Sequence, residues 1–297
     1  MRHLLSSLLQ LVAAALVCQP ACAGIVVTDV SGITIKLVAP ARRIVSLAPH
    51  ITELLFAAGA GDRVVGNVDY GNYPPAARTL SGVGGSSQLD LEAIVALKPD
   101  LVMGWESGNS PASISRLRSM GLNVYLSEPK RIQDIAGDLE RIGQLAGTEV
   151  TANAAARAFR ERYSSLAERY SQRPPVNVFY QIWKQPLMTV NGKQIISDAI
   201  GLCGGRNVFS QLPILAPTVT VEAVIAANPE VIVASGMGDV RPEWLDDWKR
   251  WRTLSAVARD NLYFVPPDLI QRHTPRVLDG AEKLCMHLEA ARGKRTR

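Results

Sequence analysis

Short runs of β-branched and other apolar residues alternate with segments that have the apolar spacing of helices. In the first half, the apolar runs lie at residues 43–47, 64–68, 101–103 and 124–126. The segments with helical spacing lie at 52–58, 91–97, 113–120 and 132–145. Alternation of this kind is typical of βαβ units around a parallel sheet, so the pattern predicts an α/β protein.

The alternation is interrupted once and then resumes. From about residue 132 to 170 the pattern stays helical, and Ser171 to Pro175 then breaks it. Strand-like runs return at 176–180, 231–233 and 263–265. We therefore expect two Rossmann-like lobes with central parallel sheets joined by one long helix: an N-terminal lobe at 24–140, a connecting helix at 141–172 and a C-terminal lobe at 173–297.

An internal repeat supports this division. Residues 89–104 read LDLEAIVALKPDLVMG, and residues 219–234 read VTVEAVIAANPEVIVA. Each copy predicts a helix with an N-cap candidate, Asp90 or Thr220, a glutamate in the first turn, Glu92 or Glu222, and then a buried strand. Two copies are too few for a solenoid. They fit two similar lobes that face each other across a cleft.

The N-terminus has the features of a secretory signal. Arg2 and His3 precede an apolar run from Leu4 to Val17, and Ala21-Cys22-Ala23 places small residues where a signal peptidase cuts. We expect residues 1–23 to be a signal peptide; lipidation at Cys18 or Cys22 is the alternative. No later stretch approaches the roughly 20 apolar residues that a spanning helix needs.

Two cysteines, Cys203 and Cys285, remain after the signal peptide. An even number in an oxidising compartment favours one disulfide, with two free thiols as the alternative. Cys285 and His287 alone cannot complete a four-ligand metal site, so we expect no metal site.

The enzyme classes lack support in the sequence. The four histidines form no motif, and the glycine clusters lack the GxGxxG frame. No GKS or GKT phosphate loop and no GxSxG elbow is present. The net charge of +5 is scattered apart from the basic tail at 292–297, which we interpret as a solvated terminus. We expect no catalysis, no cofactor and no nucleic acid partner.

Aromatic residues follow several predicted strands. Tyr70 and Tyr73 follow the strand at 64–68, Trp105 follows 101–103, and Trp183 follows 176–180. Ligands of open parallel sheets bind beyond the carboxyl ends of the strands, and flat rings there suit a large, partly apolar ligand. Packing at a hinge or rim is the alternative for each ring. By contrast, tryptophans 244, 248 and 251 have helical spacing, which predicts a core-facing stripe on an amphipathic helix.

Several motifs together resemble a known group of proteins. They are RIVSLAP at 43–49 with Thr52-Glu53, YPP at 73–75, the helix and strand from Leu91 to Val102, and LCGGRNVF at 202–209. The chain resembles the helical-backbone metal-chelate substrate-binding proteins, which serve ABC importers of iron-siderophores, haem and vitamin B12. The resemblance covers residues 40 to 290 and implies a periplasmic, monomeric carrier.

Within this group, the motifs match the branch that binds cobalamin (vitamin B12). That match implies a corrinoid ligand, a Cys203–Cys285 disulfide, and docking of Glu92 and Glu222 onto arginines of an ABC permease dimer. Together with Trp183, which the strand-end argument supplies, the predicted ligand contacts are Tyr70, Trp105, Trp183, Asp268, Leu269, Ile270, Gln271 and Arg272.

The chain departs from that branch at two positions. Ser86 and Ala216 stand where the branch has a cleft tryptophan in each lobe, and Trp183 is a candidate replacement. Cobinamide, haem and siderophores therefore stay alternatives. A haem site would use Tyr70 or His273 as an iron ligand, and a siderophore would depend on cations such as Arg272. A secreted enzyme on a two-lobed scaffold is the weakest alternative.

Overall fold

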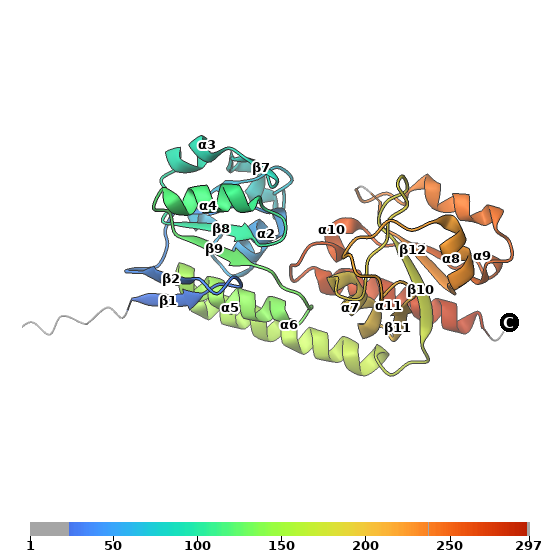
Figure 1. Cartoon of the computed structure of the whole chain (residues 1–297). Helices are drawn as coiled ribbons and strands as arrows, with labels where there is room; N and C mark the ends of the chain where they lie inside the picture. The colour runs from blue at the N-terminus through green and yellow to red at the C-terminus, as the bar shows by residue number, and fades with distance from the viewer. Residues whose placement is uncertain (1–23, 237, 296–297) are drawn as a thin grey trace, which may run out of the picture.

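Two α/β lobes lie side by side in the computed structural model, which describes residues 24–236 and 238–295 (Figure 1). The predicted signal peptide at 1–23 lies outside the described residues. Each lobe has its own parallel sheet, as the alternation of strands and helices predicts. The structure therefore confirms the predicted fold class.

The N-terminal lobe is built on a five-stranded parallel sheet in the order β5-β4-β3-β8-β9. Strands β3, β8 and β9 are almost wholly buried, as expected for parallel strands covered on both faces. Two small antiparallel hairpins, β1–β2 and β6–β7, complete the lobe. The strands are β1 (Ile25–Thr28), β2 (Thr34–Leu37), β3 (Ile44–Ser46), β4 (Val64–Asn67), β5 (Ser81–Gly82), β6 (Gly84–Gly85), β7 (Gln88–Leu89), β8 (Leu101–Trp105) and β9 (Val124–Ser127).

Helices cover this sheet on both faces (Figure 1). They are α2 (Pro49–Ala57), α3 (Leu91–Ala96), α4 (Pro111–Ser119) and α5 (Asp134–Ala146), with 3-10 turns η1 (Gly61–Arg63) and η2 (Pro75–Thr79). One apolar cluster fills the side of α2 and α5, and a second fills the side of α3 and α4. The carboxyl ends of the strands stay free for the loops that carry the candidate site.

The C-terminal lobe repeats the plan with four parallel strands in the order β11-β10-β12-β13. The strands are β10 (Val176–Gln181), β11 (Gly205–Asn207), β12 (Val231–Ala234) and β13 (Leu262–Phe264). The helices are α7 (Ile195–Leu202), α8 (Val221–Ala227), α9 (Ser255–Ala258), α10 (Pro267–Ile270) and α11 (Val277–Gly293), with the 3-10 helix η3 (Glu243–Arg250).

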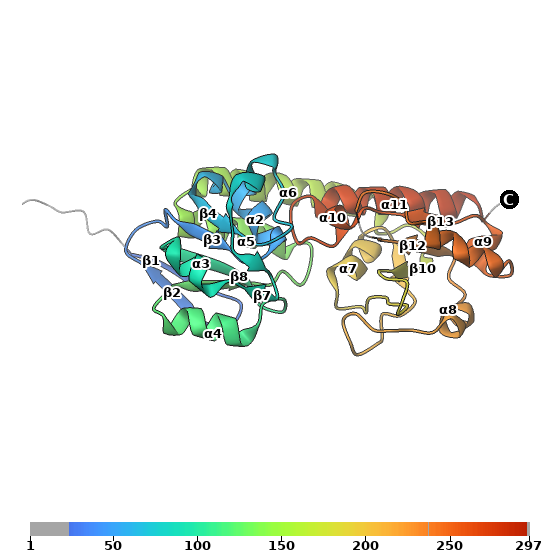
Figure 2. The ribbon, with the colours of Figure 1, turned by 90° about the horizontal axis from the view of Figure 1, so that it is seen from above.

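The helix that joins the lobes is α6 (Glu149–Tyr170), which runs beneath both of them in Figure 1 and beside α11 in Figure 2. It is shorter than the predicted range of 141–172, because residues 141–146 belong to α5. Gly147 ends α5 in the left-handed conformation at φ 60°, which favours glycine. A β-carbon on Gly143 would lie 2.5 Å from that of Ala152, so α5 and α6 pack closely at this point.

The buried face of α6 belongs to an apolar cluster that extends through both lobes. Ala152, Ala156, Phe159, Leu166 and Tyr170 recur at the spacing of one helical face and are all buried. The other faces of the two sheets have separate clusters. The connecting helix is therefore part of the core and not a loose tether.

Two further observations bear on the sequence predictions. The tryptophans at 244, 248 and 251 do pack against the cluster on the outer face of the C-terminal sheet, but they lie on and beside a 3-10 helix and not on an α-helix. Within residues 24–236 and 238–295, no helix combines the length and apolarity needed to cross a bilayer.

Candidate functional site

The aromatic and polar residues singled out in the sequence lie where strands end. Tyr70 follows β4, Trp105 closes β8, Trp183 follows β10, and residues 268–272 follow β13. Because all four strands lie in parallel sheets, these residues occupy the carboxyl edges of their sheets, where ligands of this fold class bind.

Tyr70 presents its ring to solvent with 80% of the residue exposed. Its backbone is in the left-handed region at φ 63°, which is uncommon for a residue with a side chain. Neighbouring contacts hold the loop: the Asn67 amide donates to the carbonyls of Gly71, at 2.6 Å, and Ala77, at 3.1 Å. The carbonyl of Tyr70 accepts from Arg272 Nη2 at 3.3 Å.

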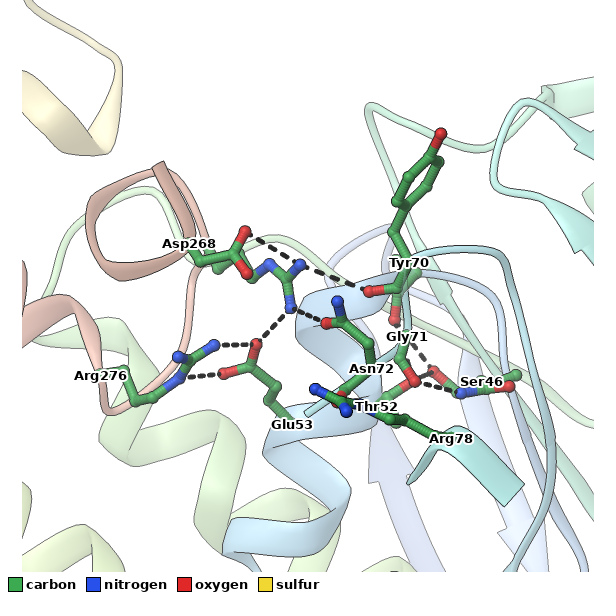
Figure 3. A network of polar contacts seen from close by, with 12 residues as sticks. Ser46, Thr52, Glu53, Tyr70, Gly71, Asn72, Arg78, Asp268 and Arg276 are labelled. Atoms are coloured by element: carbon green, nitrogen blue, oxygen red, sulfur yellow. Dashed lines mark hydrogen bonds and ion pairs between the residues drawn. The ribbon is translucent and has the colours of Figure 1, made fainter. Parts of the chain in front are cut away.

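An ion-pair network crosses between the lobes beside this loop, as Figure 3 shows. Glu53 on α2 is buried, with 2% of its side chain exposed. Its carboxylate accepts from Arg272 at 2.7 Å and makes two bonds with Arg276, at 2.6 and 2.9 Å. Arg272 also pairs with Asp268 at 3.0 Å, and the Arg276 guanidinium stacks 3.8 Å from the ring centroid of Tyr73.

A buried asparagine holds the start of the loop that follows Trp105. Asn109 accepts the backbone N–H of Trp105 at 2.7 Å and donates to the carbonyls of Leu47 and Ser86, at 2.9 and 2.8 Å. It thereby joins the ends of three N-terminal segments. The sequence reasoning missed this residue, since an asparagine in a loop is an ordinary turn signal.

The ring of Trp105 packs against two histidines. Its centroid lies 5.1 Å from that of His50 on α2 and 6.2 Å from that of His273, which follows α10. The two imidazoles lie edge to face at 5.3 Å. Within residues 24–236 and 238–295, Trp105 Nε1, His50 Nε2 and His273 Nδ1 are buried without a hydrogen-bond partner.

Burial lowers the pKa of both histidines. For His50 the pKa falls well below 6.5, first through burial and then through the charges of His273 and Arg272. Burial also lowers the pKa of His273, against the opposing influence of Glu128 and Asp138. Both imidazoles are therefore neutral at neutral pH, and an uncharged cluster lies next to the ion-pair network.

Trp183 lies in a different part of the site. It lines a cavity of about 550 Å³ in the C-terminal lobe together with Lys184, Arg241 and Trp244. The residue is 42% exposed, and its Nε1 donates to the carbonyl of Gln185 at 2.9 Å, which fixes the orientation of the ring. Trp244 was predicted as a core residue. The structure places it in both roles, packed on the outer cluster and lining this cavity.

The segment 268–272 is divided between the core and the site. Ile270 is fully buried in the core. Its side chain offers no surface to a ligand in this structure, so as a predicted contact Ile270 has only its backbone to offer. Gln271 donates to the hydroxyl of Ser235, which follows β12, at 2.9 Å, and so ties α10 to the edge that carries the Trp183 cavity. Asp268, Leu269, Gln271 and Arg272 stay predicted contacts.

The two repeated glutamates occupy equivalent positions. Glu92 lies in the first turn of α3 and Glu222 in the first turn of α8, and both are exposed. Each helix begins with the predicted cap: Asp90 accepts from the N–H of Ala93, and Thr220 accepts from the N–H of Ala223. The repeat in the sequence is therefore a repeat in structure.

Cys203 and Cys285 form the predicted disulfide, with their Cα atoms 4.7 Å apart. It joins the end of α7 to α11 across the inner core of the C-terminal lobe. In the part of the chain that the structure describes, no group of three or more His, Cys, Asp or Glu side chains is arranged to hold a metal ion.

The sequence is similar to one family of known proteins. Residues 44–269 match the family of periplasmic binding proteins. A vitamin B12-binding protein of Vibrio cholerae is 36% identical over 253 residues, 85% of this chain and 91% of that protein, and one from Vibrio parahaemolyticus is 36% identical over 259 residues, 86% and 92%.

Solved structures agree with the two-lobed fold. The crystal structure of the periplasmic vitamin B12 binding protein of Vibrio cholerae superimposes with a TM-score of 0.79 at 35% identity, over 85% of this chain and 98% of that one. A periplasmic heme-binding protein from Roseiflexus sp. RS-1 shares the fold alone, with a TM-score of 0.72 at 23% identity over 84% and 99%. This chain belongs to the periplasmic binding protein family.

Proposed function

We propose that this protein captures cobalamin between its lobes in the periplasm and delivers it to the permease of an ABC importer. One observation carries the proposal. Exposed aromatic rings from both lobes, Tyr70 and Trp183, lie at the carboxyl edges of the two sheets, and Arg272 connects those lobes. The names of the vitamin B12-binding relatives support the same ligand.

The chemistry of a corrinoid suits these groups. A corrin ring is broad, flat and partly apolar, so aromatic faces bury its surface while a few polar side chains orient it. The second amide N–H of Gln271 is a donor for the amide oxygens around the ring, and so is the Nε–H of Arg272, whose Nη1 and Nη2 groups already bind neighbouring residues. The proposed mechanism is therefore reversible binding, and no bond of the ligand is broken.

The main competing ligand is haem. The exposed hydroxyl of Tyr70 is a candidate iron ligand. His273, the other candidate from the sequence, is buried to 7% exposure, so an iron atom could reach it only after the lobes separate. The geometry thus leaves Tyr70 as the one accessible candidate of the two.

Calorimetric titration of the protein without residues 1–23 tests the proposal. We expect cyanocobalamin to bind with a one-to-one ratio and haemin to bind more weakly, because the aromatic faces fit either ring while the polar side chains of the site suit amide oxygens and offer iron only one accessible ligand, Tyr70. Tyr70→Phe serves as the control: it keeps the ring and removes the hydroxyl, so cobalamin affinity should persist. Tight haemin binding that Tyr70→Phe abolishes, with no heat from cyanocobalamin, would assign a haem carrier instead.

Delivery depends on a second pair of residues in this proposal. Glu92 and Glu222 are exposed at equivalent positions in the two lobes. This arrangement lets one glutamate contact each subunit of a dimeric permease. A first-turn glutamate is favoured by the helix dipole by only about 0.3–1 kcal/mol. That local stabilisation explains one glutamate but not the recurrence of both.

A further inference from the structure

We propose that Glu53 is the positioning residue of the ligand site. Its carboxylate, in the N-terminal lobe, holds two arginines of the C-terminal lobe and, through Arg272, fixes the backbone of Tyr70. The inference rests on the proposed function, because that function assigns Tyr70 and Arg272 to the ligand. Glu53 itself lies beneath them and is not a contact residue.

Burial makes the Glu53 carboxylate dependent on its partners. Only 2% of its side chain is exposed, and burial of an unpaired carboxylate costs several kcal/mol. Oε1 accepts from both Arg272, at 2.7 Å, and Arg276, at 2.6 Å, while Oε2 accepts from Arg276 Nε at 2.9 Å. Two cations from one lobe thus converge on one anion from the other, as Figure 3 shows.

The second step leads from Arg272 to Tyr70. The same guanidinium that binds Glu53 donates to the Tyr70 carbonyl at 3.3 Å and to Asn72 Oδ1 at 3.2 Å. A tyrosine at φ 63° keeps that conformation only where its surroundings hold it. In Figure 3 the Tyr70 ring points away from the network while its carbonyl points into it. The contact therefore orients the ring without covering it.

A parallel contact holds the far end of the same loop. The Arg276 guanidinium, fixed by two bonds to Glu53, stacks on the ring of Tyr73 at 3.8 Å. Both ends of the segment 70–73 thus depend on Glu53 through different arginines. The ring of Tyr70 and the guanidinium of Arg272 are pre-oriented as one unit, which lowers the ordering cost of binding.

Calorimetry with cyanocobalamin tests this role through Glu53→Gln, which keeps the size of the side chain and removes its charge. We expect affinity to fall at least about tenfold, the scale of one lost charged hydrogen bond. Glu140→Gln is the matched control, because Glu140 on α5 also makes two bonds to an arginine, Arg160 on α6, but at the surface and away from the 70–73 loop. The affinity of Glu140→Gln for cyanocobalamin should equal that of the wild type.

A double-mutant cycle separates positioning from general stability. If Glu53 acts through Tyr70, then Tyr70→Ala should weaken binding less in the Glu53→Gln background than in the wild type. A purely structural role for Glu53 would leave the Tyr70→Ala penalty equal in both backgrounds. Wild-type affinity in Glu53→Gln, or equal penalties, would overturn the inference.

Hydrogen exchange of the free protein gives a readout that does not depend on cobalamin. Amide exchange in peptides covering residues 70–73 should be faster in Glu53→Gln than in the wild type or Glu140→Gln. Unchanged exchange there would overturn the inference even if affinity falls.

If the wild type fails to bind cyanocobalamin, the proposed function fails, and exchange still decides whether Glu53 positions the loop. Should Glu53→Gln not fold, Arg276→Gln, which removes two of the three bonds to Glu53, takes its place in each measurement.

Discussion

At the scale of single residues, the junction of the lobes combines a paired charge cluster with an unpaired neutral one. Glu53 has its full set of charged partners. Beside it, His50 and His273 are buried with ring nitrogens that have no partner among the described residues. Buried polar atoms without partners are costly, and protonation would add a charge to that cost. This junction should therefore respond to acid.

The expected response follows from the lowered pKa of His50. The folded protein keeps this imidazole neutral below pH 6.5, its ordinary pKa, while the unfolded chain takes up a proton there. The free energy of unfolding should therefore be constant above about pH 6.5 and fall below it, by up to about 1.4 kcal/mol per pH unit for each such histidine. Urea unfolding at about pH 7.5 and about pH 5.5 measures this difference.

His50→Gln supplies the comparison, because glutamine does not titrate in this range. The loss of stability between the two pH values should be smaller in His50→Gln than in the wild type. The loss should not vanish, since burial lowers the pKa of His273 and His287 as well. An equal loss in both proteins would show that His50 does not contribute.

At the scale of elements, strands and capped helices could be predicted, because their signals are local. The buried runs at 101–103 and 231–233 coincide with β8 and β12. Asp90 and Thr220 cap α3 and α8 as their positions before apolar segments indicate. The break between α5 and α6 was missed: Gly147 was read as part of a continuous helical pattern, although it is the residue that ends α5.

Contacts between distant segments account for the other misses. Glu53 belongs to a motif that is visible in the sequence, but the motif does not reveal its partners, because Arg272 and Arg276 lie in the other lobe. Ile270 is predicted as a contact together with its neighbours, and only the structure shows that α10 turns its side chain into the core. Trp244 is the opposite case: its place on the apolar stripe predicted a core residue, but it also lines the cavity beside Trp183.

The disulfide between α7 and α11 carries a prediction at this scale. The bridged residues are separated by 82 positions, and a loop of that size gives about 4.5 kcal/mol in the chain-entropy model. In urea unfolding, the free energy of unfolding of the double variant Cys203→Ala/Cys285→Ala should be lower than that of the wild type by most of this amount. Cyanocobalamin affinity should change little, because the bridge lies in the core and not at the strand ends. Unchanged stability in the double variant would contradict this account.

At the scale of the whole molecule, the two lobes share one plan and are joined by the helix α6. The repeated helices α3 and α8 place one exposed glutamate on each lobe, Glu92 and Glu222, and α6 connects the lobes through a shared core. We expect this helical connection to restrict the lobes to a small hinge motion, unlike a pair of flexible strands. The proposed delivery therefore requires a partner that contacts both lobes at once.

The combined variant Glu92→Lys/Glu222→Lys tests that requirement. It should keep its affinity for cyanocobalamin, because both glutamates lie away from the predicted contacts, and lose uptake in cells that depend on this importer. Each single variant should show an intermediate loss. Glu149→Lys, an exposed first-turn glutamate of α6, is the matched control and should transport normally. Full uptake by the combined variant would remove both glutamates from the docking surface.

The continuous helix α6 has a consequence for how this protein can change over evolution. Each residue of an α-helix adds about 1.5 Å and about 100° of rotation. One inserted or deleted residue in α6 would therefore swing one lobe around the other, part Glu53 from its arginines and misalign Glu92 with Glu222. The length of α6 therefore fixes the relative orientation of the two lobes, and under the proposed function a change in that length would have to be matched by a change in the permease.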